Sequence, residues 1–282
     1  MRESGTNMLD WAAMIIEQNK FQDLLNLIEK LNFEVEEIKN QNIKISIKND
    51  QTPVTQADLF VNDQLNKFIK TTNYKNVISE ENKKADYEDR SSWDWFWIID
   101  PIDGTKEFIK KGNDYTINIA LCYKNRPVLS VVSKPSSGDI YYACKNGGAY
   151  KNGHSISSNN VENNIKLIAS KSHLNKETER FISELSKSLD FETISIGSSL
   201  KICVLAEGKA QIYPRFGTTM EWDTAAADLI LTESGGKLLN CSNLKPLIYN
   251  KEDLRNDYFI CFSESLSDEQ KKTIKSLVNT NA

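Results

Sequence analysis

The sequence predicts a layered α/β protein with two packed subdomains. The chain has 282 residues, which is enough for a large core or for two smaller ones. Its first half combines amphipathic helices with an antiparallel meander of strands, which is typical of an α+β unit. Its second half alternates strands and helices, which is typical of an α/β unit. A polar seam at Asn159 and Asn160 separates the two patterns, so we expect subdomains over 1–158 and 159–282.

Hydrophobic periodicity predicts the individual elements. Apolar residues recur at helical spacing over 9–31 and alternate strictly with polar residues over 43–48. Thr55 and Asp58 have the pattern of a capping box at a helix start. The other elements expected in the first subdomain are a turn over 49–53, a helix to residue 69, a short strand over 77–81, a solvated loop over 83–92, a strand, loop and helix over 95–109, and strands over 116–122, 128–132, 139–143 and 149–150.

The second subdomain is expected to alternate regularly between strand and helix. Its expected strands cover 166–169, 192–196 and 210–213, and its expected helices cover 176–189, 198–207 and 223–234. Gly208 and Gly235 each follow one of these helices, at the position where glycine commonly ends a helix.

Composition and charge exclude several classes of protein. The net charge is −4, whereas a protein that binds nucleic-acid polymers usually carries a basic face. No apolar run approaches the roughly 18 residues of a membrane-spanning helix, and the polar residues 1–7 lack a signal-peptide core. The five cysteines are odd in number and widely spaced, so we interpret them as reduced, buried thiols. We therefore expect a cytoplasmic protein with a small-molecule partner.

The segment 100–105, Asp-Pro-Ile-Asp-Gly-Thr, is the strongest functional signal in the chain. It follows an apolar run that predicts a buried strand, so Asp100 and Asp103 lie together at the end of that strand. Neighbouring carboxylates remain ionised only where a cation compensates them, and such oxygen ligands suit Mg²⁺. Gly104 permits close backbone approach, and Thr105 offers a hydroxyl at a helix start. The alternative is an ordinary polar connection between a strand and a turn.

Two further carboxylates extend this pattern. Glu80 ends an expected strand, and Asp223 opens an expected helix. Ligand sites of layered α/β proteins gather where strand ends converge. If these residues converge with Asp100 and Asp103, the four carboxylates form a site for two or three Mg²⁺ ions, which can clamp a phosphoryl group. The alternative for Asp223 is a charge that stabilises the helix N-terminus.

The sequence resembles the inositol monophosphatase superfamily. The matching segments are 79–81 (Ser-Glu-Glu), 100–105 and 222–226 (Trp-Asp-Thr-Ala-Ala). Within this superfamily it is most similar to the bacterial 3'(2'),5'-bisphosphate nucleotidases of sulfate assimilation, through the segments 103–110, 197–201 and 213–217. The resemblance extends from about residue 9 to beyond residue 246, and it is weaker over 33–48 and after residue 250. It implies a sugar-phosphatase fold with αβαβα layers.

The resemblance also implies a set of metal ligands. Glu80, Asp100 and the carbonyl oxygen of Ile102 would hold a first Mg²⁺. Asp100, Asp103 and Asp223 would hold a second, with Asp100 bridging the two ions. By the same resemblance we expect inhibition by lithium, which would compete for a Mg²⁺ site.

The catalytic residues are likewise implied by the resemblance. Thr105 would hydrogen-bond the attacking water, and Asp58 would hold Thr105 and draw off the proton, without a covalent phosphoenzyme. The N–H groups of Gly104 and Thr105 would hold the phosphate. From the residues alone, Asp58 is better interpreted as a helix-capping carboxylate, and Glu81 is expected at the solvated surface. Relatives also imply a position that is cytoplasmic or peripheral at the inner face of the cell membrane.

Substrate choice is expected outside the metal cluster. Ser198 and Lys201 open an expected helix, where hydroxyl, N–H and ammonium groups together would bind a second anion. The alternative is an ordinary helix cap with an exposed lysine. Arg215 stands where inositol-type relatives usually carry an acidic residue, and arginine suits a second phosphate or a base. His173 stands where related nucleotidases contact the nucleotide, with a surface histidine as the alternative. The other residues expected to contact substrate are Glu80, Ile102, Asp103, Gly104, Thr105 and Asp223.

These features favour a Mg²⁺-dependent phosphomonoesterase that hydrolyses adenosine 3',5'-bisphosphate to AMP and phosphate, with a role in sulfate assimilation. The alternative on the same scaffold is hydrolysis of inositol phosphates or of fructose 1,6-bisphosphate. A third hypothesis is a non-catalytic metal or nucleotide sensor. We rank it last, because Thr105 and all the expected ligands are present.

Overall fold

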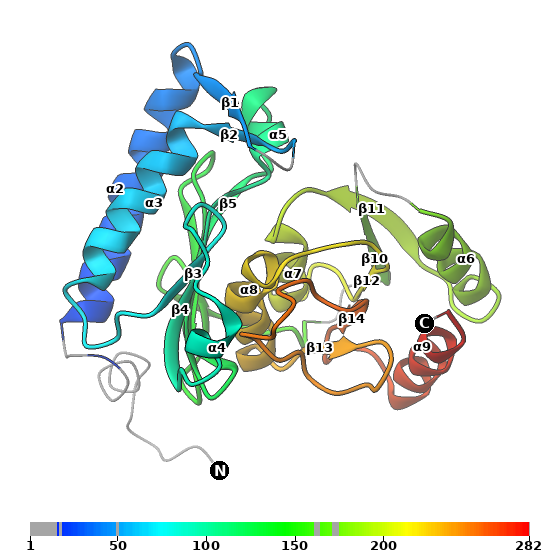
Figure 1. The fold of residues 1–282 in the computed structure, drawn as a ribbon. Coiled ribbons are helices and arrows are strands. Elements are labelled where there is room, and N and C mark those ends of the chain that lie inside the picture. The colour runs from blue at the N-terminus through cyan, green and yellow to red at the C-terminus, as the bar shows by residue number, and fades with distance from the viewer. Residues whose placement is uncertain (1–15, 17–18, 49–50, 161–163, 171–174, 282) are drawn as a thin grey trace.

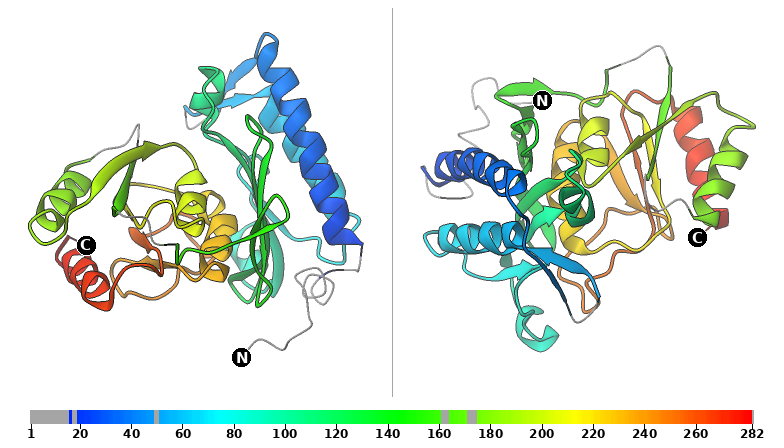
Figure 2. Two further views of the ribbon diagram at one scale, coloured as in Figure 1. Left: turned by 180° about the vertical axis from the view of Figure 1, so that it is seen from behind. Right: turned by 90° about the horizontal axis from the view of Figure 1, so that it is seen from above.

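The computed structural model describes residues 16, 19–48, 51–160, 164–170 and 175–281. Helices and sheets follow one another across the molecule in five layers, in the order helix, sheet, helix, sheet, helix (Figure 1). The predicted αβαβα architecture is therefore confirmed. The same layers are seen from behind and from above, where one pair of helices closes each end of the molecule (Figure 2).

The first outer layer contains α2 (Lys20–Asn40) and α3 (Gln56–Ile69), which pack side by side. The expected end of the first helix at residue 31 is wrong. The buried positions continue at helical spacing through Val35 and Lys39, so the helix reaches Asn40. The part of this prediction before residue 19 lies outside the described residues, apart from Ile16. The capping box at the start of α3 is confirmed, because the backbone N–H of Thr55 donates to Asp58 Oδ2 at 2.8 Å.

A sheet of seven strands forms the second layer. Its strands, in sheet order, are β3 (Val77–Ser79), β4 (Trp95–Asp103), β5 (Thr116–Tyr123), β6 (Arg126–Lys134), β7 (Asp139–Cys144), β8 (Gly148–Lys151) and β9 (His154–Ile156). Strand β3 runs parallel to β4, and the other neighbours are antiparallel. The parallel pair matters for the site, because β3 and β4 end at the same edge of the sheet.

The loop expected to be solvated over 83–92 contains a short helix, α4 (Tyr87–Arg90). Its Arg90 is buried and donates to Asn250 Oδ1 at 2.8 Å and to the carbonyl of Lys251 at 2.5 Å. The expectation of a solvated loop is therefore wrong at this residue. The hydrogen bonds from its two terminal nitrogens offset part of the cost of burying this charge.

The middle layer consists of α7 (Leu200–Ala206) and α8 (Glu221–Glu233). Helix α8 is buried on almost all sides, because it packs against the seven-stranded sheet and also against β13 of the second sheet. Its run Ala225, Ala226 and Ala227 is fully covered, and small side chains of this kind allow close approach from both sides.

A sheet of five strands and two outer helices complete the fold. The strands, in sheet order, are β11 (Glu192–Ile196), β10 (Lys166–Ser170), β12 (Ile212–Arg215), β14 (Phe259–Phe262) and β13 (Lys237–Asn240). The outer helices are α6 (Lys176–Leu185) and α9 (Asp268–Asn281), which lie side by side (Figure 1). Strands β13 and β14 and helix α9 were not predicted, and α6 ends four residues before the expected residue 189.

The first sheet ends at Ile156 and the second begins at Lys166, on either side of the predicted subdomain boundary. The two halves nevertheless share one hydrophobic core around α8. All five cysteines are buried and free, as expected. In the described part of the chain, no helix combines the length and the hydropathy needed to cross a membrane.

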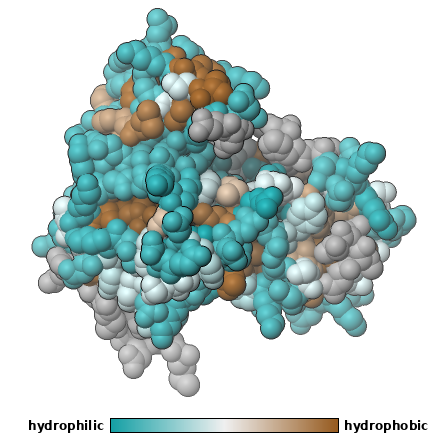
Figure 3. All heavy atoms as spheres, viewed as in Figure 1, coloured by the Kyte–Doolittle hydropathy of each residue, from teal (hydrophilic) through white to brown (hydrophobic). Residues whose placement is uncertain are grey.

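A small hairpin of β1 (Ile45–Ile47) and β2 (Pro53–Thr55) projects beyond the five layers. Apolar side chains gather over it at the top of the space-filling view (Figure 3), where Ile45 and Ile47 are exposed. Residues 49–50 of the expected turn lie outside the described residues. The helix α5 (Thr105–Ile109) contacts β2, so the hairpin stands next to the segment 100–105.

Candidate active site

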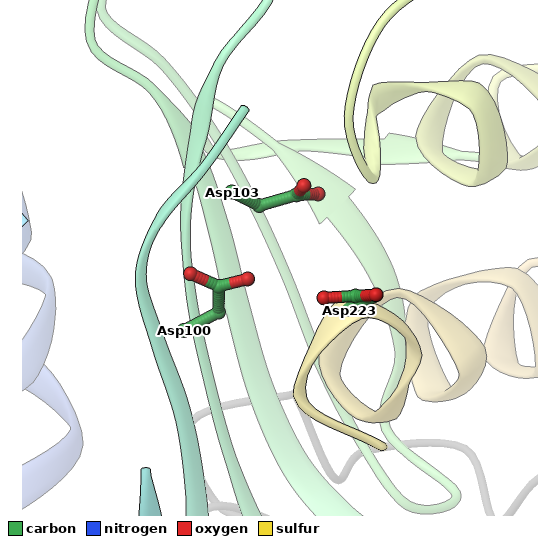
Figure 4. Close-up of side chains that lie close together, drawn as sticks. All are labelled: Asp100, Asp103 and Asp223. Atoms are coloured by element: carbon green, nitrogen blue, oxygen red, sulfur yellow. The ribbon is translucent and has the colours of Figure 1, made fainter. Parts of the chain in front are cut away.

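The carboxylates of Asp100, Asp103 and Asp223 converge at one point between the first sheet and α8. One oxygen of each lies within 4.8 Å of the others. Asp100 and Asp103 come from the end of β4 and Asp223 comes from the first turn of α8, and all three point toward one another (Figure 4). The structure therefore brings together three of the four carboxylates that the sequence singles out.

A β-bulge explains why both aspartates of β4 face α8. Alternate residues of a strand point to opposite faces, so Asp100 and Asp103 would diverge in a regular strand. Here Asp100 pairs with Asn118 and Asp103 pairs with Thr116, so β4 contains one extra residue. The extra residue turns Asp103 onto the face of Asp100. The side chain of Ile102 is fully buried on the opposite side, in the core beneath α2 and α3.

The electrostatics of the cluster indicate that a cation belongs there. Burial, together with the charges of Glu80, Asp103 and Asp223, raises the pKa of Asp100 well above its ordinary value. Burial and the charge of Asp103 raise the pKa of Asp223 to about 7. Asp100 Oδ1 is buried without a hydrogen-bond partner among the described residues. An unpartnered buried carboxylate oxygen is costly, and a metal ion removes that cost by binding it.

Glu80 stands beside this cluster and faces a lysine. Its N–H donates to the carbonyl of Ile99 at 3.2 Å, which places it at the shared edge of β3 and β4. Its Oε1 lies 2.8 Å from Lys48 Nζ, and the same ammonium is 2.5 Å from Glu81 Oε1. The side chain of Glu81 is only 5% exposed, so its expected position at the solvated surface is wrong. Lys48 compensates the negative charge of both glutamates.

Thr105 and Asp58 form the second predicted element of the site. Thr105 Oγ1 lies 3.1 Å from Asp58 Oδ1 and 3.0 Å from the carbonyl oxygen of Ile102. The other carboxylate oxygen of Asp58 is held by the N–H and the hydroxyl of Thr55. Burial raises the pKa of Asp58, and the hydrogen bonds from Thr55 and Thr105 oppose that rise. Asp58 is therefore both a capping residue and the partner of Thr105.

The two cationic residues that the sequence predicts for substrate binding, Lys201 and Arg215, line the same cleft as the acidic cluster. Lys201 is only 7% exposed, which excludes the alternative of an exposed lysine. Burial, together with the charge of Arg215, lowers the pKa of Lys201 to about 8 against the attraction of Asp103. Arg215 Nη2 donates to the carbonyl of Thr218 at 2.9 Å, and its Nε is buried without a partner among the described residues.

The anion site expected at the start of α7 differs from the prediction. This helix has only seven residues, and the N–H of Ser199 donates to Asp103 Oδ2 at 2.6 Å. That N–H therefore binds a carboxylate of the protein itself. The hydroxyl of Ser198 lies 3.4 Å from the N–H of Leu200. His173 lies outside the described residues, so its predicted contact stays a prediction.

A single cleft of about 770 Å³ joins the acidic and cationic sides. The predicted residues that line it are Glu80, Asp100, Ile102, Asp103, Gly104, Thr105, Ser198, Lys201, Arg215 and Asp223. Sequence reasoning missed Lys84, whose Nζ lies 2.5 Å from the carbonyl of Glu80 and 4.8 Å from the ring centroid of Trp222. It also missed Tyr213, whose buried ring lies beneath Lys201. No local pattern marks either residue.

The fold and the acidic cleft are those of a known family: the chain belongs to the inositol monophosphatase family, whose model matches residues 18–281. It is 36% identical over 243 residues to 3'(2'),5'-bisphosphate nucleotidase CysQ of Haemophilus influenzae, covering 83% of this chain and 89% of that protein. It is also 36% identical over 210 residues to the CysQ nucleotidase of Escherichia coli K12, covering 73% of this chain and 83% of that protein.

Solved structures agree with this assignment. The crystal structure of CysQ from Bacteroides thetaiotaomicron, a bacterial member of the inositol monophosphatase family, superposes with a TM-score of 0.77 at 36% identity. The match covers 88% of this chain and 99% of that chain. A staphylococcal inositol monophosphatase I, at 21% identity and a TM-score of 0.76, shares the fold.

Proposed function

We propose that this protein is a Mg²⁺-dependent 3'(2'),5'-bisphosphate nucleotidase that hydrolyses adenosine 3',5'-bisphosphate to AMP and phosphate. The observation that carries the proposal is the division of one cleft into an acidic cluster and a separate cationic side. A substrate with one reacting phosphate and one distant phosphate matches that division. The names of the relatives in Haemophilus and Escherichia support the same substrate.

The residues of the acidic cluster fit Mg²⁺. All the donors are oxygens, and Asp100 Oδ1 is buried without a partner among the described residues. We infer that Asp100, Asp103 and Asp223 would hold the metal, with Glu80 and the carbonyl of Ile102 as the further predicted ligands. When bound, Mg²⁺ would lower the pKa of a coordinated water and stabilise the negative charge on the leaving oxygen.

The pair Thr105 and Asp58 is proposed to move the proton of the attacking water. While the Thr105 hydroxyl donates to Asp58 Oδ1, its lone pairs can accept a hydrogen bond from water. As the water attacks phosphorus, Thr105 Oγ1 takes its proton and passes its own to Asp58 Oδ1. Burial of Asp58 raises its pKa, which favours this transfer. The relay activates water, so the proposal includes no covalent phosphoenzyme.

Lys201 and Arg215 are proposed to bind the phosphate that does not react. Both line the cleft, and burial of Lys201 strengthens its attraction for an anion. The Nε of Arg215 is a donor that lacks a partner among the described residues, so a phosphate oxygen would complete its hydrogen bonds. In the cell, the proposed reaction would remove the bisphosphate nucleotide that sulfate assimilation leaves behind.

The experiment that tests the function measures phosphate release from adenosine 3',5'-bisphosphate with Mg²⁺ and with EDTA. Inositol 1-phosphate and fructose 1,6-bisphosphate serve as competing substrates under the same conditions. Release from the nucleotide that depends on Mg²⁺, with AMP as the product on chromatography, supports the proposal. Faster release from either sugar ester would contradict the assigned substrate and leave the metal site as proposed.

A further inference from the structure

We propose that Ser199 is a positioning residue that couples the cationic side of the cleft to the carboxylate cluster. Through this coupling, a nucleotide phosphate at Lys201 and a metal ion at Asp103 would strengthen each other's binding. The inference rests on the proposed function, because it concerns the nucleotide's non-reacting phosphate and the metal of the same site.

One peptide group joins the two sides of the cleft. Its carbonyl, on Ser198, accepts a hydrogen bond from Lys201 Nζ at 2.7 Å. Its N–H, on Ser199, donates to Asp103 Oδ2 at 2.6 Å. Hydrogen bonds at the two ends of one amide polarise each other, and low local polarity strengthens both. The ammonium of Lys201 therefore supports the negative charge of Asp103 through this peptide as well as through space.

Buried polar side chains hold the peptide in place. Ser199 Oγ lies 2.8 Å from Thr116 Oγ1 and 2.8 Å from Asn118 Oδ1, and all three residues are almost fully buried. Thr116 and Asn118 belong to β5, where they pair with Asp103 and Asp100 of β4. Strand β5, which pairs with the strand that presents Asp100 and Asp103, therefore clamps the peptide at the start of α7.

The backbone before Ser199 shows that this placement is imposed. Ser198 has a φ of +50°, in the left-handed region that serine rarely adopts. A Cβ on the preceding Gly197 would lie 2.7 Å from Asp114 Cβ, so only glycine fits against the segment that precedes β5. The Gly197 N–H also donates to Asp114 Oδ2 at 3.2 Å. Such strain persists where the surroundings enforce it, and it concentrates at functional sites.

The sign of the coupling follows from the charges. A phosphate bound to Lys201 neutralises the ammonium that compensates Asp103. Asp103 then offers more negative charge to a metal ion, so the phosphate tightens metal binding. By thermodynamic linkage, the metal tightens phosphate binding by the same factor. Coupling through space alone needs only the charges, whereas the proposed route also needs Ser199 to be held in place.

The test is the dissociation constant of Mg²⁺, measured by titration calorimetry with and without saturating AMP. AMP carries the 5'-phosphate and lacks the 3'-phosphate that reacts. In the wild-type protein, we expect AMP to lower this constant by about fivefold or more. Ser199→Ala keeps every charge and the N–H but removes the hydroxyl that holds the peptide. The ratio of the Mg²⁺ dissociation constants without and with AMP should therefore fall toward one. Thr116→Val, which is nearly isosteric, should shift the ratio in the same direction.

Ser186→Ala is the matched control, because Ser186 is an exposed serine at the end of α6, and it should keep the wild-type ratio. The proposal is overturned if either clamp variant that retains its circular dichroism spectrum keeps the full ratio, since the coupling then runs through space. It is also overturned if AMP leaves the wild-type constant unchanged. Failure of the proposed function shows separately, as a lack of phosphate release from the bisphosphate.

Discussion

The carboxylate of Asp58 and the hydroxyl of Thr105 meet at 3.1 Å although 47 positions separate them in the chain. The contact joins the first turn of α3 to the first residue of α5, next to the acidic cluster. Because Thr55 occupies the other oxygen of Asp58, only Oδ1 remains available to Thr105. The cap of α3 thus holds Asp58 Oδ1 toward Thr105, as the proposed proton transfer requires.

Removing the Thr105 hydroxyl should slow the reaction without weakening substrate binding. We expect Thr105→Val to lower kcat by about 10²- to 10⁴-fold, the range of general acid–base catalysis, with a small change in KM. Thr105→Ser keeps the hydroxyl and should retain most of the activity. Steady-state kinetics on adenosine 3',5'-bisphosphate measure both. Equal activity of the valine and serine variants would show that the hydroxyl takes no part in the proton transfer.

Asp103→Asn should lower the activity and raise the stability of the metal-free protein. The amide oxygen can still accept the Ser199 N–H, but a metal-binding charge is lost, so we expect kcat/KM to fall by about a thousandfold or more. Without metal, the variant should unfold at a higher temperature than the wild type, because one fewer negative charge is repelled within the cluster. Thermal melts with EDTA and with Mg²⁺ test this.

The matched control for Asp103→Asn is Asp63→Asn, an exposed aspartate of α3 that pairs with Lys67. It should leave both the activity and the Mg²⁺-dependent rise in unfolding temperature unchanged. A metal-free Asp103→Asn protein that melts well below the wild type would contradict the assignment of repulsion to this cluster.

The stability of the metal-free protein should fall as the pH rises from about 4 to about 7. The pKa of Asp223 rises from 3.8 in its ordinary state to about 7 in the folded protein. Between these values the folded state binds a proton that the unfolded state has lost, so raising the pH favours unfolding. Urea unfolding at several pH values with EDTA measures this. Asp223→Asn should flatten the dependence, and an equally steep slope in that variant would contradict the attribution.

Arg215→Ala should weaken the binding of the bisphosphate and spare simple esters. Loss of a charged hydrogen bond to the second phosphate should raise KM for the nucleotide by about ten- to a hundredfold, with little change in kcat. A phosphate ester without a second phosphate should be turned over as before. Arg180→Ala, an exposed arginine of α6, is the control. Equal losses on both substrates would make Arg215 structural.

Lithium should inhibit the enzyme by competing with Mg²⁺ for the acidic cluster. We expect inhibition at millimolar lithium that depends on the Mg²⁺ concentration, and potassium chloride at the same ionic strength should have no such effect. Rate measurements over a grid of both cations test this. Identical effects of lithium and potassium would rule out competition at the metal site.

The acidic cluster could be predicted because its signals are local. A buried strand followed by two aspartates, a strand that ends in Glu80, and a helix that opens with Asp223 are each visible in a few neighbouring residues. The parallel pairing of β3 with β4 then brings the first two strand ends to one edge. The family resemblance supplied the roles of Thr105 and Asp58, which no local pattern distinguishes from helix capping.

The features that were missed depend on contacts between distant segments. The ion pair between Lys48 and Glu81 joins a hairpin to a strand end, so no residue near Glu81 in the chain indicates that its side chain is buried. Strands β13 and β14 have four residues each, and β14 inserts between β12 and β13 out of chain order. The N–H groups at the start of α7 were expected to bind a substrate anion, but folding places Asp103 against the N–H of Ser199.

The position of α8 between the two sheets has a consequence for protein synthesis. Asp100 and Asp103 leave the ribosome early, whereas Asp223 and the interior strand β14 follow much later. A nascent chain therefore presents two of the three clustered carboxylates without the third, and lacks the complete proposed metal site. Binding of a cation is expected to accompany the last stage of folding, and Mg²⁺ would then stabilise completed molecules rather than partly synthesised ones.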